Sequence, residues 1–222
     1  QKSQRNPDLP TGAIEILVEE CGVFNESETP PFEIQDGIDT NEDKRLEYRY
    51  LDLRRPEMQK NLITRHHLNR TTRDYFTENG FLEIETPYMV KYTPGGARNF
   101  LVPSRVHPGS LAESPQLYKQ LLMCAGYDRY YQIVRCFRDE DLRLDRQLEF
   151  TQIDVEMSFI APEDVFSIID GLVRLIWREA DPSHPIEIGE IPRLTYQEAI
   201  SRFGIDRPDL RFGLELIDVG PI

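Results

Sequence analysis

The segment RYYQIVRCFRDEDLRLDRQLEFTQIDVEMSF, residues 129–159, decides the fold, because it encodes two long strands joined by a charged connection. Successive side chains of a strand alternate between the two faces of its sheet. We expect the first strand over 129–138 and the second over 147–159. The connection, 139–146, is short and almost wholly charged, which suits an antiparallel hairpin. The segment therefore predicts an antiparallel sheet in the centre of the chain.

The alternation gives this hairpin one polar face and one apolar face. The polar face holds Gln132, Val134, Cys136 and Arg138 from the first strand and Phe150, Gln152, Asp154 and Glu156 from the second. The apolar face holds Tyr131, Ile133 and Phe137, followed by Ile153, Val155, Met157 and Phe159. Charged side chains on a broad sheet must face water or a ligand, because burying an unpaired charge is costly. The polar face is therefore either a solvated surface with internal Arg–Asp pairs or a ligand site, and spacing alone leaves both open.

Two long helices are predicted, one before and one after the hairpin. The first covers 56–79, and Gly80 stands in the position of a C-terminal cap. A short strand, 81–85, follows it. The second helix covers 162–180 and carries an apolar stripe at helical spacing. Hairpin-connected strands with interspersed helices indicate an α+β fold.

A shorter helix is predicted over 114–126. Ser114 is a good N-cap, Pro115 suits the first helical position, and Gly126 can close the end. One helix face then holds Gln116, Lys119 and Gln120, and another holds Leu117, Leu121 and Cys124. We expect the apolar face to anchor this helix on the rest of the protein.

The chain of 222 residues has a formal net charge of −13, which argues against a general nucleic-acid binder. Residues 54–154, however, carry 15 basic and 13 acidic side chains, so a polyanionic ligand is expected only in this centre. No run of 18 apolar residues occurs, and we expect neither a transmembrane helix nor a membrane partner. Cys21, Cys124 and Cys136 are expected to be reduced and packed, as in an intracellular protein.

Familiar catalytic and metal-binding motifs are absent from the sequence. It has no Gly-rich phosphate loop, GxGxxG, CxxC, HExxH or EF-hand pattern. Its four histidines are not set among plausible metal ligands, and no GxSxG elbow supports a hydrolase. We therefore expect no metal site within this chain.

Four strings carry a resemblance to a known family: SPQLYKQLLM at 114–123, CFRDEDLR at 136–143, DRQ at 145–147 and EFTQID at 149–154. They resemble the aspartyl-tRNA synthetases of the bacterial type, in subclass b of class II. The resemblance runs through nearly the whole chain. It implies a class II synthetase-type antiparallel sheet flanked by helices. It also implies a homodimer whose interface includes Pro87, at the end of the first family motif.

The resemblance implies roles for individual residues. Arg138 would be the catalytic residue, binding both the α-phosphate of ATP and the aspartate carboxylate. The other ATP-binding residues would be Asp139, Glu140, Gln147 and Phe150, of which Phe150 would stack on adenine. The other aspartate-binding residues would be Ser114, Gln116, Lys119, Asp154 and Gly95. Lys119 would read the side-chain carboxylate, and many bacterial members carry Glu in place of Gly95.

The implied activity is that of an aspartate–tRNA ligase, which makes aspartyl adenylate from aspartate and ATP and transfers the aspartyl group to the 3′ end of tRNA. ATP would be a co-substrate, and Mg²⁺ would be held mostly by ligands outside this chain. The implied partners are aspartate, ATP and the tRNA for aspartate, with the tRNA for asparagine left open. The implied location is the cytoplasm, with the mitochondrial matrix as the alternative.

The resemblance also implies a division of the chain. Residues 1–34, with a strand at 13–18, would be the remnant of an N-terminal anticodon-binding OB-fold. Residues 35–55 would be a linker, and 56–202 would be the first part of the catalytic domain, with motifs 1 and 2. Residues 203–222 would enter an insertion domain. The third family motif is not in this sequence, so we expect the chain alone to be inactive.

Two alternatives remain open at this point. One is another class II subclass b synthetase, for asparagine or lysine. Lys119 argues against lysine as the substrate, because two ammonium groups would face each other. The other is a catalytically inactive, synthetase-like binding module, against which the set of Lys119, Arg138, Glu140 and Gln147 weighs.

Overall fold

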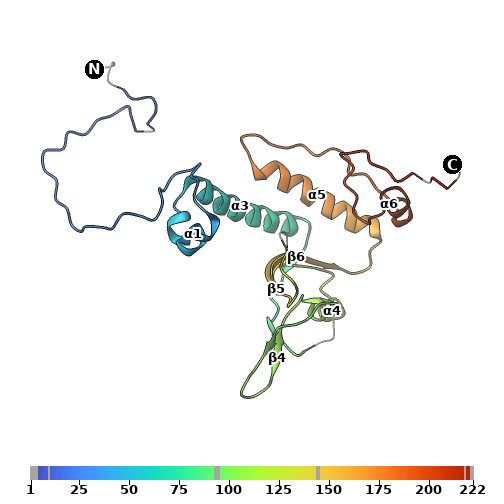
Figure 1. Cartoon of the computed structure of the whole chain (residues 1–222). Coiled ribbons are helices and arrows are strands. Elements are labelled where there is room, and N and C mark those ends of the chain that lie inside the picture. Colours follow the sequence, from blue (N-terminus) through green and yellow to red (C-terminus); the bar gives the residue numbers. More distant parts are fainter. Residues whose placement is uncertain (1–4, 10, 93–95, 144–145, 218, 221–222) are drawn as a thin grey trace. The chain divides into compact units, whose positions relative to one another are not determined.

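The computed structural model describes residues 5–9, 11–92, 96–143, 146–217 and 219–220 (Figure 1). The chain divides into two units, Gln1–Gln59 and Lys60–Ile222. Helix α3 (Pro56–Glu78) begins in the first unit and runs on into the second. The second unit contains the hairpin and therefore the candidate site.

The predicted hairpin is confirmed. Strands β5 (Arg129–Phe137) and β6 (Glu149–Met157) pair antiparallel over all nine residues of each. The backbone N–H of Arg138 donates to the Leu148 carbonyl at 2.8 Å, which extends the pairing by one step. Strand β1 (Leu82–Glu83) joins β5 in parallel, so the order is β1-β5-β6 and the sheet is mixed, not purely antiparallel.

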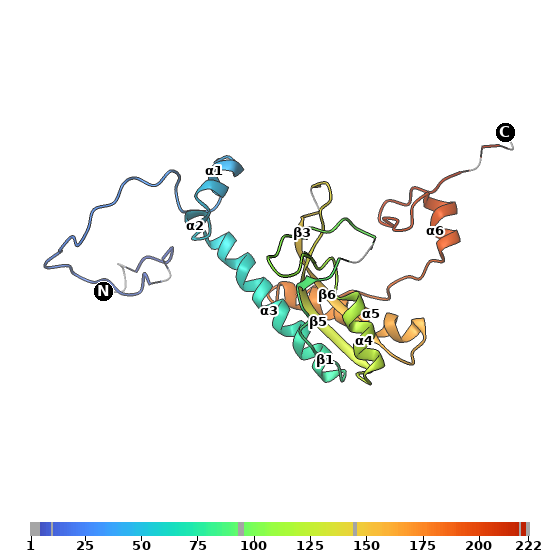
Figure 2. The same ribbon diagram turned by 90° about the horizontal axis from the view of Figure 1, so that it is seen from below.

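The apolar face of the hairpin packs on α3 and on α5 (Pro162–Ala180), whose bounds match the prediction. The buried core here consists of Phe76, Phe81, Tyr131 and Leu172, with Tyr75, Val155, Met157, Ile168 and Ile176 packed against it. The Phe76 ring stacks on Tyr131 with 4.7 Å between centroids. Figure 2 shows the hairpin between α3 on one side and α4 on the other. The fold is α+β, as predicted.

Gly80 ends α3 as expected, and it does so with a positive φ of 77°. Its N–H donates to the Thr77 carbonyl at 3.0 Å, and the N–H of Phe81 donates to the Phe76 carbonyl at 2.9 Å. This is the Schellman pattern, which favours glycine at the left-handed position. The turn brings Phe81 onto Phe76, with 5.1 Å between ring centroids, and so leads directly into β1.

Helix α4 (Gln116–Cys124) lies on the polar face and corrects two expectations. The helix starts after Pro115, which has no side-chain cap bond, so Ser114 is not the N-cap. The face with Leu117 and Leu121 is more than half exposed, at 54% and 55%, while Lys119 is the buried residue. Helical spacing identified an apolar face, but two carboxylates on β6 turn the Lys119 face toward the sheet.

All three cysteines are free, as expected, but only one of them is packed. Cys136 is buried on the polar face of β5, whereas Cys21 and Cys124 are exposed. Cys124 follows the outward orientation of its helix. Cys21 lies in a part of the first unit that forms no helix or strand in the described residues.

Phe159 does not continue the apolar face of the second strand, because β6 ends at Met157. The N–H of Ser158 donates to the Asp128 carbonyl at 3.0 Å and its hydroxyl contacts the Met123 sulfur at 3.1 Å, so the chain turns there. Phe159 takes a φ of 56° and is 99% exposed. A positive φ is uncommon for a bulky residue, and here it redirects the chain toward α5.

A second, small sheet was not predicted. Its order is β2 (Met89–Val90), β4 (Gly109–Leu111), β3 (Leu101–Val102), and both pairings are antiparallel. Gly109 permits the close approach of two strands, because a Cβ there would lie 2.8 Å from the Val90 carbonyl oxygen. Helix α6 (Tyr196–Phe203) was also missed.

The expected strand at 13–18 is wrong. These residues form no strand, and Ile14, Ile16, Leu17 and Val18 are each at least 69% exposed. A strand needs a partner for its backbone groups, and none lies beside this segment among the described residues. Two short helices, α1 (Glu42–Glu47) and α2 (Arg49–Asp52), lie within the range predicted as a linker.

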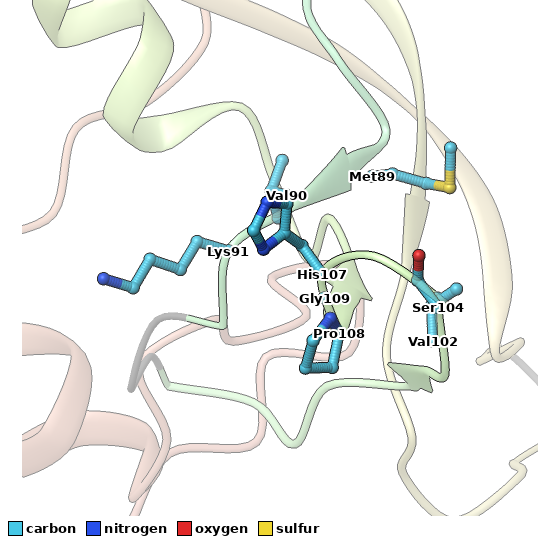
Figure 3. Close-up of a pocket in the computed structure, with 8 residues that line it drawn as sticks. All are labelled: Met89, Val90, Lys91, Val102, Ser104, His107, Pro108 and Gly109. Atoms are coloured by element: carbon cyan, nitrogen blue, oxygen red, sulfur yellow. The ribbon is translucent and has the colours of Figure 1, made fainter.

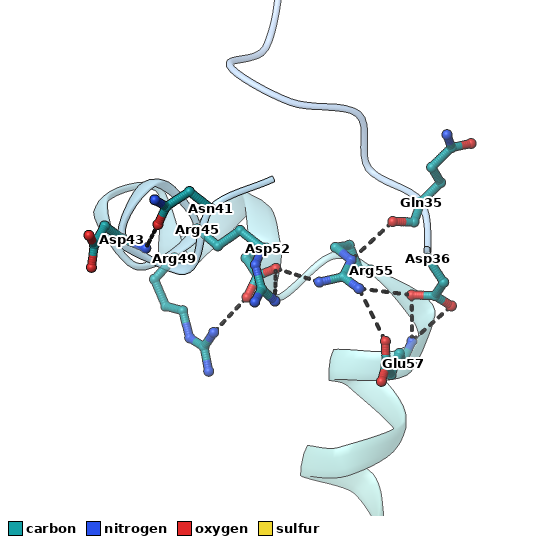
Figure 4. A network of polar contacts seen from close by, with 9 residues as sticks. All are labelled: Gln35, Asp36, Asn41, Asp43, Arg45, Arg49, Asp52, Arg55 and Glu57. Carbon is teal, nitrogen blue, oxygen red and sulfur yellow. Dashed lines mark hydrogen bonds and ion pairs between the residues drawn. The ribbon is translucent and has the colours of Figure 1, made fainter. Parts of the chain in front are cut away.

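A buried ion-pair network organises the end of the first unit (Figure 4). Asp52 is fully buried and accepts bonds from Arg49 at 2.5 Å and Arg55 at 2.9 Å. The Arg55 guanidinium also donates to the Gln35 carbonyl at 3.0 Å and to Glu57 at 3.1 Å. Burial opposes ionisation of Asp52, yet the arginines hold the pKa of its carboxyl below the ordinary value. The network ties α2 to the segment before α1 and to the start of α3.

The contact between α3 and α5 gives a test of this packing. The Tyr75 hydroxyl donates to the Ile168 carbonyl at 2.8 Å, and a Cβ at Gly171 would overlap with that hydroxyl oxygen. Glycine-to-alanine changes inside helices usually stabilise by about 0.5–1 kcal/mol. We expect Gly171→Ala to lower the free energy of unfolding instead, by about 1–3 kcal/mol, measured by urea denaturation.

Tyr75→Phe supplies the matched background for this experiment, because it removes the hydroxyl and keeps the ring. In that background Gly171→Ala should be neutral or stabilising. Equal destabilisation by Gly171→Ala in both backgrounds would show that the hydroxyl does not set the helix spacing.

Candidate active site

The floor of the candidate site is the polar face of the β5–β6 hairpin. Phe150, Gln152 and Asp154 share this face, since alternate residues of a strand point the same way. Phe150 and Asp154 are four residues apart, which separates them by about 13 Å along the strand. The site therefore has two ends, with Gln152 between them.

One end is built around the ammonium group of Lys119. Its Nζ lies 2.9 Å from Asp154 Oδ1 and 3.2 Å from Glu156 Oε2. The side chains of Lys119 and Asp154 are only 11% and 10% exposed. Two carboxylates two residues apart on β6 thus converge on one cation from α4, and this arrangement fixes the helix over the sheet.

Asp154 keeps an unused oxygen. Its Oδ2 is buried and has no hydrogen-bond partner among the described residues. Burial raises the pKa of the Asp154 carboxyl, and the hydrogen bond and charge of Lys119 work against that rise. A buried acceptor without a donor is costly, so this oxygen is a natural acceptor for a ligand N–H.

The middle of the floor is polar, but its cysteine is not reactive near neutral pH. The Cys136 thiol donates to Gln152 Oε1 at 3.2 Å. Burial, with the charge of Asp154, raises the pKa of this thiol to about 11. The thiolate is the nucleophilic form of cysteine, so Cys136 is unsuited to nucleophilic catalysis near neutral pH.

A buried hydrogen-bond triad joins two residues of β5 to Thr86, which follows β1. The hydroxyls of Thr86 and Tyr130 both donate to Gln132 Oε1, at 2.9 and 3.0 Å. All three residues are at most 6% exposed. Burial raises the pKa of the Tyr130 hydroxyl, which keeps it protonated as a donor. Since Gln132 pairs with Asp154 across the hairpin, the triad stiffens the floor next to the Lys119 cluster.

The other end of the site contains Arg138 and Phe150. The guanidinium carbon of Arg138 lies 5.1 Å from the centroid of the Phe150 ring, a cation–π contact. The Arg138 Nε is buried and has no acceptor within the described part of the chain. An arginine with a free, buried donor is suited to bind a phosphate or carboxylate oxygen.

A hollow of about 280 Å³ lies at the hairpin connection, lined by Arg98, Glu140, Asp141, Arg143 and Arg146. Asp139 ties the segment of Arg98 to this connection. The Asp139 N–H donates to the Arg98 carbonyl at 2.9 Å, and Arg98 Nε donates to the Asp139 carbonyl at 3.0 Å. Three guanidinium groups around one hollow suit a polyanionic ligand.

Several of the residues expected in the site are not joined to these clusters. Ser114 is half-buried before α4, while Gln116 and Gln147 are exposed. In the described ranges, no side-chain hydrogen bond or ion pair connects these three to the rest of the site. Pro87 is exposed, and Gly95 lies outside the described residues.

Sequence reasoning missed three parts of the site. It placed Glu156 on the polar face but did not pair it with Lys119, and it did not find the Thr86–Gln132–Tyr130 triad or Arg98. The position of Gln132 on the polar face was the available signal for the triad. Nothing in the spacing indicates that Arg98 meets Asp139, because 41 residues separate them.

Another hollow, of about 500 Å³, lies at the small sheet (Figure 3). Its lining includes Val90, Lys91, Ser104 and His107, and the Lys91 ammonium points away from the others. None of the residues expected in the site lines it.

No described residues form a metal-binding group. Within the ranges that the structure describes, no three His, Cys, Asp or Glu side chains come together as ligands. No helix in the described part of the chain is both long and apolar enough to cross a bilayer.

Comparison with known proteins gives a consistent picture. The family model described as tRNA synthetases class II (D, K and N) matches residues 41–219. An aspartate–tRNA(Asp/Asn) ligase from Halothermothrix orenii is 61% identical over 98% of this chain and 37% of that protein. An aspartate–tRNA ligase from Ruminiclostridium cellulolyticum is 55% identical over the same shares. The chain thus spans little more than a third of the length of these curated relatives.

A solved structure supports the fold. A crystal structure of a candidate aspartyl-tRNA synthetase from Leishmania major Friedlin superposes with a TM-score of 0.62. Its sequence is 25% identical, and the match covers 70% of this chain and 32% of that one.

Lys119→Met tests the ion-pair cluster. The change leaves two carboxylates on β6 without their cation, so we expect the free energy of unfolding at pH 8 to fall by about 3 kcal/mol. Leu117 and Leu121 cannot make up for this loss by anchoring α4, because both are exposed. Denaturant unfolding of the variant, with the exposed Lys60→Met as control, measures the loss.

The pH dependence of this loss has a defined sign. The Asp154 carboxyl has a raised pKa, and removing Lys119 raises it further, so the folded variant binds more protons than the unfolded chain. Its stability should therefore rise as the pH falls from 8 to 5, and the gap to wild type should narrow. Adding Asp154→Asn should recover part of the loss at pH 8. A loss that is the same at both pH values would contradict the cluster.

Proposed function

Because this chain belongs to the class II tRNA synthetases for aspartate, lysine and asparagine, we propose that it carries part of the active site of an aspartate–tRNA ligase. In the first step, the α-carboxylate of aspartate attacks the α-phosphorus of ATP, and pyrophosphate leaves. In the second, a hydroxyl of the terminal adenosine of tRNA attacks the acyl carbon, and AMP leaves. Relatives named as aspartate–tRNA ligases support this choice within the family.

The buried ammonium of Lys119 is the observation that carries the proposal. An ammonium group has three N–H donors, and Asp154 and Glu156 account for two of them. The third is available to the side-chain carboxylate of aspartate. A lysine substrate would bring a second ammonium group to this point, and asparagine would bring no charge. The third N–H therefore favours a side chain with an acceptor oxygen and disfavours a second ammonium group.

Arg138 supplies the positive charge for the activation step. Its guanidinium, whose Nε has no acceptor among the described residues, can donate to the α-phosphate and to the attacking carboxylate, which holds the two reactants together. The same donor stabilises the charge that develops on the phosphoryl oxygens. Phe150 offers its ring to adenine, while Asp139, Glu140 and Gln147 contact the rest of the nucleotide. Neither step needs a protein nucleophile, in keeping with the raised pKa of Cys136.

The partners of the whole protein belong to the same proposal. The hollow with Arg98, Arg143 and Arg146 suits the phosphates of the tRNA acceptor end. The tRNA would be that for aspartate, with the tRNA for asparagine as a second substrate, as in the names of several relatives. We further propose a homodimer with the exposed Pro87 at its interface.

Amino-acid-dependent exchange of pyrophosphate into ATP, measured on the full-length protein, tests the proposal. We expect exchange with L-aspartate and none above background with L-asparagine or L-lysine. Exchange driven by either of the others would assign the protein to the corresponding synthetase. No exchange with any of the three would favour a binding module without catalysis.

Arg138→Ala should remove the activation step. We expect kcat/KM for aspartate-dependent exchange to fall by about 100- to 1,000-fold, because a preorganised cation at the developing charge is lost. Arg135→Ala is the matched control, since this arginine lies on the same strand and forms an exposed pair with Glu149 at 3.2 Å. It should stay within about twofold of wild type. Similar losses in both variants would remove the special role of Arg138.

A further inference from the structure

Glu113 is a carboxylate that the mechanism above does not use. It stands directly before Ser114 in the segment that leads into α4, and it is half-buried. Among the described residues it has no hydrogen bond and no ion pair. A carboxylate withdrawn from water without a cationic partner is unfavourable, so its position calls for an explanation.

The backbone on both sides of Glu113 is fixed. The N–H of Ala112 donates to the Tyr88 carbonyl at 2.8 Å, and its carbonyl accepts from the Phe137 N–H at 3.0 Å. Phe137 is the last residue of β5 and lies between Cys136 and Arg138. Because Ala112 is bonded to Phe137, the next residue, Glu113, lies close to the end of this strand. After it, Pro115 is buried and α4 begins. The backbone of Glu113 is therefore held at the border of the site.

Glu113 lies close enough to the floor of the site to act on it. Its negative charge contributes to the raised pKa of the Cys136 thiol, after the larger effects of burial and Asp154. Lys119 and Arg138 act on the same thiol in the opposite direction. The charges of Asp154, Glu113, Arg138 and Lys119 thus all act on the Cys136 thiol, and the bond between Ala112 and Phe137 places the backbone next to Glu113 at the end of β5.

The four charged groups differ in whether they have a partner in the structure. Lys119 already has two carboxylates within 3.2 Å, and Arg138 lies over Phe150. Glu113 forms no ion pair in the described ranges, although Lys119 and Arg138 act on the same thiol. A ligand that brings a positive charge would therefore be held at Glu113.

We propose that Glu113 binds the α-ammonium group of the amino-acid substrate. This inference rests on the proposed function, because L-aspartate is the cation-bearing ligand that the function supplies. The α-ammonium has three N–H donors, so it can bond to Glu113 and to the free Oδ2 of Asp154 at once. Lys119 then binds the side-chain carboxylate of L-aspartate, and Glu113 binds its α-ammonium group.

The test compares two ligands that differ only in the ammonium group. Full-length wild type and Glu113→Gln are assayed for pyrophosphate exchange with L-aspartate, and succinate serves as a competitive inhibitor without an amino group. Glutamine keeps the size and removes the charge. We expect the KM for L-aspartate to rise at least about tenfold, since a hydrogen bond between two charged groups is lost. The KM for ATP and the inhibition constant of succinate should stay within about twofold.

Two further variants sharpen the test. Glu113→Asp keeps the charge on a shorter side chain and should recover part of the affinity for L-aspartate. Glu149→Gln changes an exposed carboxylate of β6 that pairs with Arg135, and it should leave all three constants unchanged.

The outcomes separate this inference from the proposed function. If wild type exchanges with L-aspartate and Glu113→Gln has an unchanged KM, the inference is overturned and the function stands. Equal weakening of L-aspartate and succinate would also overturn it, because the residue would then not read the ammonium. If wild type shows no aspartate-dependent exchange, both fall.

Discussion

The burial of one lysine ammonium between α4 and β6 is the constraint on which the rest of the site depends. A buried cation is tolerated only when carboxylates lie close to it, and Asp154 and Glu156 meet that requirement at 2.9 and 3.2 Å. To reach them, α4 turns its Lys119 face to the sheet and leaves Leu117 and Leu121 exposed. The helix thus covers the sheet with the face of Lys119 and not with the face of Leu117 and Leu121.

The hairpin makes this arrangement possible because one of its faces packs in the core and the other carries the site residues. Tyr131, Val155 and Met157 pack with α3 and α5 and hold the sheet in the fold. The alternate residues carry the ion pair, the buried triad and Arg138 on the other face. A shift of the register by one residue would exchange the two faces, so the core that stabilises the sheet also positions the chemistry.

Much of this fold could be predicted because the relevant signals are local. The period of two in residues 129–159, the apolar stripe of α5 and the glycine after α3 each reflect a regular backbone. The two-residue strands of the small sheet are too short to show a period. Helix α6 did carry a signal, the capping box of Thr195 and Glu198 followed by Gly204, which went unused.

The wrong predictions share one physical cause. A sequence pattern does not show which residues pack against it in the folded protein. The apolar run at 13–18 has strand composition but no partner strand among the residues that the structure describes. The apolar face of α4 is real, yet a pair of carboxylates decides which face is covered. Residues Lys119 and Asp154 could be named from a family resemblance, whereas their contact, the role of Glu156 and the tie between Arg98 and Asp139 depend on the folded chain.

The protonation of Asp154, followed by carbon-13 NMR of its carboxyl group across a pH titration, tests the buried cluster most directly. We expect a pKa above the ordinary aspartate value of 3.8 in wild type, because burial outweighs Lys119, and a further rise in Lys119→Met. A value at or below 3.8 in both proteins would contradict this expectation, because Asp154 would then be a solvated surface group.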